Sequence, residues 1–187
     1  GYSFTNNQSR TLNQSFDKDL QTGQYTVLDQ DILNDFDFSS LKNGVNASLT
    51  YKSSSLTVNL SNRVDFEDVK RTYNNLNKIL QRDQTSVNPN LSINYKISKS
   101  KNLNFRYTGR TAQPSLTQIE PLRQNAQPLI EYLDNPDLKA GFNNSYFINY
   151  NSYKQLKDRG VYFYVSADQG RKSINNFVRY NLEEGTQ

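Results

Sequence analysis

The chain has 187 residues, 34% of them hydrophobic, with a mean hydropathy of −0.86 and a net charge of +4. Cysteine and histidine are absent, which excludes disulfides, thiolate- or histidine-ligated zinc and any catalysis that needs a histidine base within this chain. Charges of both signs are interspersed without a dense Lys/Arg block, so nucleic acid is not an expected partner. The sequence contains no run of about 18 apolar residues, so no transmembrane helix is predicted. A membrane barrel is compatible with this composition, because only alternate residues of its strands need be apolar.

The first 43 residues contain weak strand signals and an acidic cluster. Tyr2 and Phe4 alternate with polar residues, and residues 20–23 are typical of a hairpin tip, because Gly23 supplies a positive φ. Four aspartates follow in residues 24–43: Asp29, Asp31, Asp35 and Asp37. Their spacing is not that of an EF-hand loop, and both a calcium site and a solvated loop or sheet extension stay open.

Regular alternation begins at residue 43. Two runs, 45–51 and 56–60, alternate apolar with polar residues and are joined by the short connection 52–55, which predicts a hairpin with one apolar face. We expect residues 62–89 to form a long polar connection, with a helical turn at about 73–81 because Leu76, Ile79 and Leu80 have helical spacing.

The second half repeats this pattern. Alternating runs at 91–97 and 103–108 flank a tight turn at 98–102, and further strands are expected at about 143–151, 161–167 and 173–182. Between residues 110 and 142 lie four of the five prolines, which predicts a long structured loop. Tyr51, Tyr95 and Tyr150 fall near the short-turn ends of their strands, which suits a membrane interface or ordinary cross-strand pairing.

Three motifs in the long loop carry a family resemblance. They are Gln113-Pro114-Ser115, Gln118-Ile119-Glu120-Pro121 and Asn135-Pro136-Asp137-Leu138-Lys139, followed by a strand. This order resembles the TonB-dependent receptor-like outer-membrane β-barrel proteins of Bacteroidetes, in which the last motif usually continues Pro-Glu where this chain has Ala140 and Gly141. The resemblance is specific over residues 90–153 and diffuse elsewhere.

The resemblance implies the fold class. We expect an all-β, antiparallel up-and-down meander that forms a segment of a large transmembrane β-barrel, with long extracellular loops at about 62–89 and 110–142. Short and long connections alternate along the chain, as they do in barrels with short periplasmic turns and long outer loops. Residues 1–187 are interpreted as an internal barrel segment without a plug domain.

The resemblance also implies a function in the outer membrane of a Gram-negative bacterium. The chain would belong to a TonB-dependent receptor or transporter that binds and imports a nutrient, with no cofactor. Its partners would be outer-membrane lipid, the rest of the barrel, a plug domain, TonB and a surface lipoprotein. Candidate ligand contacts are polar or aromatic residues of the long loop: Arg110, Gln113, Arg123, Asn125 and Tyr132. Packing of the loop against itself is the alternative role for each of them.

Two other classes of function are weighed against this one. A soluble β-sandwich that binds a glycan or a protein would also use many aromatic residues and one apolar face per sheet. An enzyme is not expected, because no paired-carboxylate arrangement stands out and the commonest general base is missing.

Overall fold

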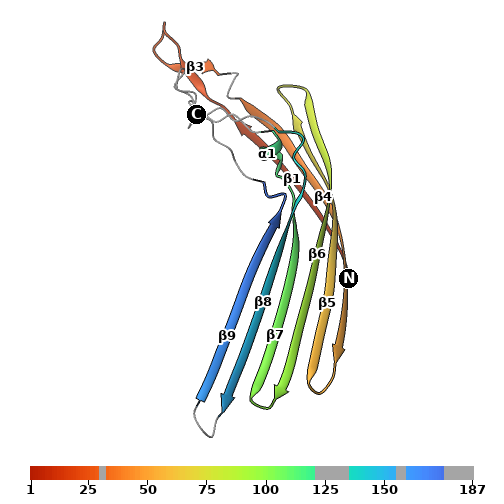
Figure 1. Cartoon of the computed structure of the whole chain (residues 1–187). Coiled ribbons are helices and arrows are strands. Elements are labelled where there is room, and N and C mark those ends of the chain that lie inside the picture. Colours follow the sequence, from red (N-terminus) through yellow and green to blue (C-terminus); the bar gives the residue numbers. More distant parts are fainter. Residues whose placement is uncertain (30–32, 121–134, 155–158, 175–187) are drawn as a thin grey trace.

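A computed structural model describes residues 1–29, 33–120, 135–154 and 159–174. Within them, one antiparallel sheet of seven strands has the order β1-β4-β5-β6-β7-β8-β9 (Figure 1). Its strands are β1 (Tyr2–Asn13), β4 (Asn34–Lys52), β5 (Leu56–Tyr73), β6 (Lys78–Ser98), β7 (Lys101–Ala112), β8 (Gly141–Lys154) and β9 (Arg159–Arg171). The predicted all-β meander is confirmed, and in the described part of the chain the sheet is open, with β1 and β9 as its edges.

A small hairpin separates β1 from β4. It consists of β2 (Phe16–Lys18) and β3 (Tyr25–Leu28), and its tip lies where the sequence predicts it, with Gly23 at φ 72°. The N–H of Gln21 donates to Asp19 Oδ1 at 2.8 Å, and this bond lowers the pKa of the Asp19 carboxyl. Among the described residues, the one helix is α1 (Leu116–Ile119), so none is long and apolar enough to cross a membrane.

The expected connection at 62–89, with its helical turn, is wrong. β5 and β6 pair without interruption from Leu56↔Tyr95 to Tyr73↔Lys78, and only residues 74–77 form the turn, where Asn77 has φ 50°. Hydrophobic alternation fails as a signal here because the belt-face positions beyond Phe66 are mostly polar, whereas Val69 and Leu80 lie on the opposite face. The strand expected at 173–182 lies mostly outside the described residues.

The register divides the sheet into two faces of opposite character. Cross-strand partners in antiparallel pairs share a face, so apolar residues line up in rows across the strands. We call one face the apolar belt, after three such rows: Leu49, Leu60, Leu91, Tyr107, Tyr146 and Ala167; Tyr51, Val58, Ile93, Phe105, Ile148 and Val165; Leu56, Tyr95, Leu103, Tyr150 and Phe163. The opposite side, which we call the polar face, carries mainly Asn, Ser, Thr and charged side chains.

The height of the apolar belt matches a bilayer. On β5 the apolar residues run from Leu56 to Phe66, and on β6 from Val87 to Ile97, each a span of ten steps from the first residue to the last. At about 3.3 Å per residue and a tilt of about 40°, such a span rises about 25 Å, the height of the apolar band in outer-membrane barrels. Strands β4, β5 and β6 continue well beyond this band, on the side where α1 lies (Figure 1).

We predict that charge is tolerated on one face of β6 and not on the other. Replacing Ile93 by arginine places a charge at mid-belt and is expected to lower the free energy of unfolding in lipid vesicles by about 2–4 kcal/mol. Asn94→Arg, one residue along on the polar face, is the matched control and should cost less than about 1 kcal/mol. Because the chain lacks tryptophan, unfolding in urea is followed by far-UV circular dichroism. Equal costs for the two variants would contradict this assignment of the faces.

Candidate functional site on the polar face

Ion pairs occupy the middle of the polar face on β4 and β5. Arg63 Nη2 lies 2.8 Å from Asp65 Oδ1, and Lys42 Nζ lies 3.8 Å from Asp65 and 3.9 Å from Glu67. Arg63 also donates to Ser3 Oγ on β1 at 2.9 Å, and Ser40 donates to Glu67 at 2.6 Å. The carboxylates here are thus each held by cations or hydroxyl donors, which is what a buried group such as Asp65 requires.

Gly44 makes room for these ion pairs. A Cβ atom at this position would lie 2.5 Å from Arg63 Nη2 and 2.5 Å from Asp65 Oδ1. Gly44 is paired directly with Asp65 across the β4–β5 ladder. The absence of a side chain therefore allows the carboxylate and guanidinium to lie over the backbone of β4.

Beyond these ion pairs, the connection after β7 folds back onto the polar face. Its helix α1 begins with a capping box, in which Ser115 Oγ accepts from the N–H of Gln118 and Gln118 Oε1 accepts from the N–H of Ser115. Leu116 and Ile119 are buried against Val69 of β5, with Phe38 and Leu80 packed around them. The preceding Pro114 is fully buried. This small cluster is the main hydrophobic core of the described residues, and it lies on the polar face.

Basic side chains of β5 and β6 hold the connection between β7 and β8 by its carbonyl and carboxylate groups. Arg71 donates to the carbonyl of Glu120 at 3.4 Å, Lys78 lies 2.9 Å from the Glu120 carboxylate, and Arg82 donates to the carbonyl of Leu138. Arg71 is itself buried, with its guanidinium 4.8 Å from the Phe36 ring centre and 5.8 Å from that of Tyr73. These two aromatic rings enclose the Arg71 guanidinium and fix its orientation.

The end of β7 and the residue that follows it complete the hydrogen bonding of β6. The strand pairing of β6 with β7 begins at Asn90, so the part of β6 before Asn90 has no described strand partner on that edge. Thr111 Oγ1 accepts from the N–H of Val87 at 2.8 Å and donates to its carbonyl at 2.9 Å. Gln113 donates to the carbonyl of Thr85 at 2.7 Å. Side chains thus replace the missing strand along this edge.

The predicted ligand contacts have different outcomes. Arg110 lies exposed on β7, on the polar face by its register. Gln113 is bound to Thr85 and Ser86, so its described role is to anchor the loop. Arg123, Asn125 and Tyr132 lie outside the described residues. The basic residues that hold the loop were not predicted, and no sequence signal marks them, because their role depends on the β5–β6 register.

The acidic cluster is spread over strand and hairpin. Asp35 and Asp37 lie on β4, where Asn74 donates to both, at 3.0 and 3.2 Å, and Arg10 lies 3.5 Å from Asp35. Asp31 lies outside the described residues. No group of three or more potential metal ligands is found among the residues that the structure describes. Asp35 and Asp37 therefore tie β4 to its neighbours, whereas Asp29 follows β3, and its N–H donates to the carbonyl of Ser15 at 2.8 Å.

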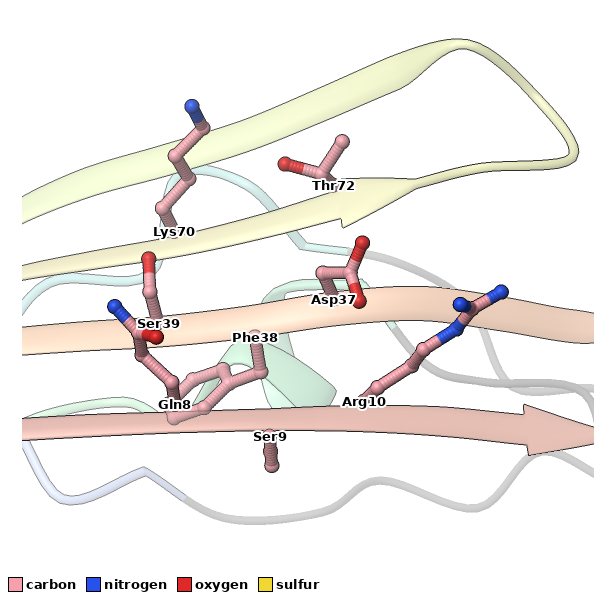
Figure 2. Close-up of a pocket in the computed structure, with 8 residues that line it drawn as sticks. All are labelled: Gln8, Ser9, Arg10, Asp37, Phe38, Ser39, Lys70 and Thr72. Carbon is pink, nitrogen blue, oxygen red and sulfur yellow. The ribbon is translucent and has the colours of Figure 1, made fainter.

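A shallow pocket of about 430 Å³ lies over β1, β4 and β5 (Figure 2). Figure 2 shows its polar and charged lining: Gln8, Arg10, Asp37, Ser39, Lys70 and Thr72, with Ser9 and Phe38 completing the wall. By the register these six polar side chains share the face of the apolar belt but lie beyond its end. The pocket is therefore separate from the polar face, and we assign no ligand to it.

Comparison with known proteins gives one match. A family model described as "Outer membrane protein beta-barrel family" matches residues 1–187. Searches of curated proteins and of solved structures found no match.

We predict that Arg71 keeps the segment around α1 on the polar face. In Arg71→Met the bond to Glu120 and the aromatic enclosure are lost, at a cost of about 1–3 kcal/mol for a buried charged donor. The amides of residues 116–120 should then exchange with deuterium about 10–100 times faster, measured by mass spectrometry in micelles. Lys70→Met changes the neighbouring residue, which points to the other face, and should leave this exchange unchanged. Unchanged exchange in both variants would show that Arg71 does not hold the segment.

Proposed function

The chain belongs to the outer membrane protein beta-barrel family, and from this premise we propose that it forms wall and outer loops of a TonB-dependent receptor-like transporter that imports a nutrient. The protein lies in the outer membrane of a Gram-negative bacterium, as its family indicates. Its apolar belt accordingly contacts lipid, and its polar face lines the interior of the barrel.

The observation that carries the proposal is the position of the α1 segment, by which we mean residues 113–120. A connection between two strands of the wall turns back onto the polar face and is held there by Arg71, Lys78 and Arg82. This segment contains the Gln-Pro-Ser and Gln-Ile-Glu motifs on which the family resemblance rests. In a closed barrel, a loop fixed on the polar face would narrow the route through the interior. Such a narrowing suits a receptor that selects its solute more than it suits an open pore.

The proposed mechanism is capture followed by energised release. A nutrient would bind to the outer loops and the polar face, and movement of a plug domain, driven through TonB, would open the route inward. The remaining strands of the barrel and the plug are the partners that this mechanism needs, and a surface lipoprotein could deliver the nutrient. No covalent chemistry and no cofactor are assigned to the chain.

The soluble β-sandwich is not supported. A sandwich covers the apolar face of each sheet with a second sheet. In the described part of the chain the single large sheet leaves its apolar belt uncovered: Leu49 is 70% exposed and Phe163 56%. Lipid is the environment in which such a surface is stable, in agreement with the family.

We predict that import through this protein requires energy. A strain that lacks the protein should fail to take up at least one nutrient from a panel of peptides, oligosaccharides and metal chelates. Uptake of that nutrient by the parent strain should stop when a protonophore collapses the proton-motive force that TonB uses. Reintroduction of the wild-type protein and of Lys70→Met should restore uptake equally. Uptake that depends on the protein but continues with the protonophore would indicate a passive pore instead.

A further inference from the structure

The basic side chains of the polar face form two groups with different surroundings. On β4, β5 and β6, Lys42, Arg63, Lys78 and Arg82 bind acidic side chains or a backbone carbonyl, and Arg71 lies in its aromatic enclosure. The second group is Lys96 on β6 with Arg106 and Arg110 on β7. Within the described ranges these three are exposed and make no ion pair or hydrogen bond through their side chains.

The three cations of the second group lie along one line. Arg110 and Arg106 are four residues apart on β7, which places them about 13 Å apart along the strand. Arg106 is paired with Ser92 on β6, and Lys96 lies four residues further along that strand, again about 13 Å. The line therefore runs from near the α1 segment toward the short turns at the other end of the sheet.

Little negative charge opposes this line. Among the described polar-face residues of β7, β8 and β9, the one acidic side chain is Asp168, and it accepts a hydrogen bond from Ser145 at 2.5 Å. The remaining positions apart from the two arginines are uncharged, and they include the asparagines Asn104, Asn149 and Asn151. A wall with one sign of charge attracts solutes of the opposite sign, and pores lined by arginine and lysine select anions.

Aromatic rings lie beside Arg106 on the same face. Phe147 is paired directly with Arg106 and is 38% exposed, although it lies among polar side chains. Tyr164, 72% exposed, is paired with Asn149 on the next row. Exposed rings next to a cation suit a ligand that has an apolar or ring surface as well as a negative charge, which inorganic anions lack.

We propose that Lys96, Arg106 and Arg110 form an anion path on the polar face, which binds an organic carboxylate and passes it along the wall. Arg106 binds the carboxylate through its planar guanidinium, with Phe147 against the carbon skeleton of the ligand. Spaced cations hold the anion at successive positions without binding it too tightly to leave. The passage inward rests on the proposed import function, whereas the binding of the carboxylate does not.

The test is calorimetric titration of the purified protein in detergent micelles. The carboxylate probes are citrate and trigalacturonate, and the comparison probes are maltotriose, which is neutral, and inorganic phosphate. We expect at least one carboxylate to bind more tightly than both comparison probes, with an affinity that falls as salt is added. Tighter binding of trigalacturonate would identify an acidic sugar as the ligand class, and tighter binding of citrate a small polycarboxylate.

Substitutions test whether the carboxylate binds to the anion path. Loss of two charged donors in the double variant Lys96→Gln, Arg106→Gln should weaken carboxylate binding about tenfold or more. Arg106→Lys should keep part of the affinity, and Lys70→Gln, which removes an unpaired cation from the other face, should keep all of it. Far-UV circular dichroism checks that each variant is folded.

Several results would overturn the proposal. They are no binding of either carboxylate, binding of maltotriose or phosphate as tight as that of the carboxylates, or unchanged carboxylate affinity in the folded double variant. The proposed function is judged separately by energised uptake. If a carboxylate binds but uptake continues with the protonophore, the anion path is retained and TonB-driven import is rejected. If uptake stops with the protonophore but no carboxylate binds, TonB-driven import is retained and the anion path is rejected.

Discussion

The structure depends on the hydrogen bonding of a backbone that has no water around it. In the hydrocarbon region every N–H and C=O group must find a partner within the protein, and a sheet does this only through continuous strand pairing. Strands β4 to β9 pair in this way through most of the height of the apolar belt, and at Val87 the side chain of Thr111 supplies the hydrogen bonds instead. Because side chains alternate along a strand, the same ladder separates a lipid-facing surface from a polar interior surface.

This separation determines what each face can do. The apolar belt has to be uniformly apolar, because one charge at mid-belt lowers the stability of the fold. A uniform surface of this kind leaves little scope for recognition of a ligand. The polar face is free to vary, and the chain uses it in two ways. Arg63 is neutralised by Asp65, and Arg71 and Lys78 hold the α1 segment, whereas Lys96, Arg106 and Arg110 are left available to a solute. Support for the loop and capture of a ligand are thus assigned to different parts of one surface.

Much of the fold could be predicted because alternation is strong within the belt. The runs around Val45, Leu60, Ile93, Phe105 and Val165 all form strands with the expected apolar face. The outer halves of β5 and β6 were missed for a physical reason. Above the membrane neither face has to be apolar, so residues 67–86 carry no clear period, although their backbones pair as regularly as below.

The candidate site was less predictable, because it depends on tertiary contacts. Gln113 was singled out as a polar residue of an important loop, but its partner is the backbone of Thr85, 28 residues away. The enclosure of Arg71 requires Phe36 and Tyr73 to be paired across β4 and β5 and α1 to lie beside them. Phe147, which interrupts the apolar alternation of its strand, is explained by the register, which places it beside Arg106 on the polar face.

The central claim is that one face of this sheet contacts lipid and the other contacts water. The chain has no cysteine, so single cysteines at residues 90–97 of β6 can each carry a spin label without competing sites. In vesicles, collision with oxygen, which concentrates in lipid, is compared with collision with a water-soluble nickel chelate. We predict strict alternation, with oxygen collision favoured at Leu91, Ile93 and Tyr95 and nickel collision at Asn90, Ser92 and Asn94. Equal nickel access at all these positions would contradict it.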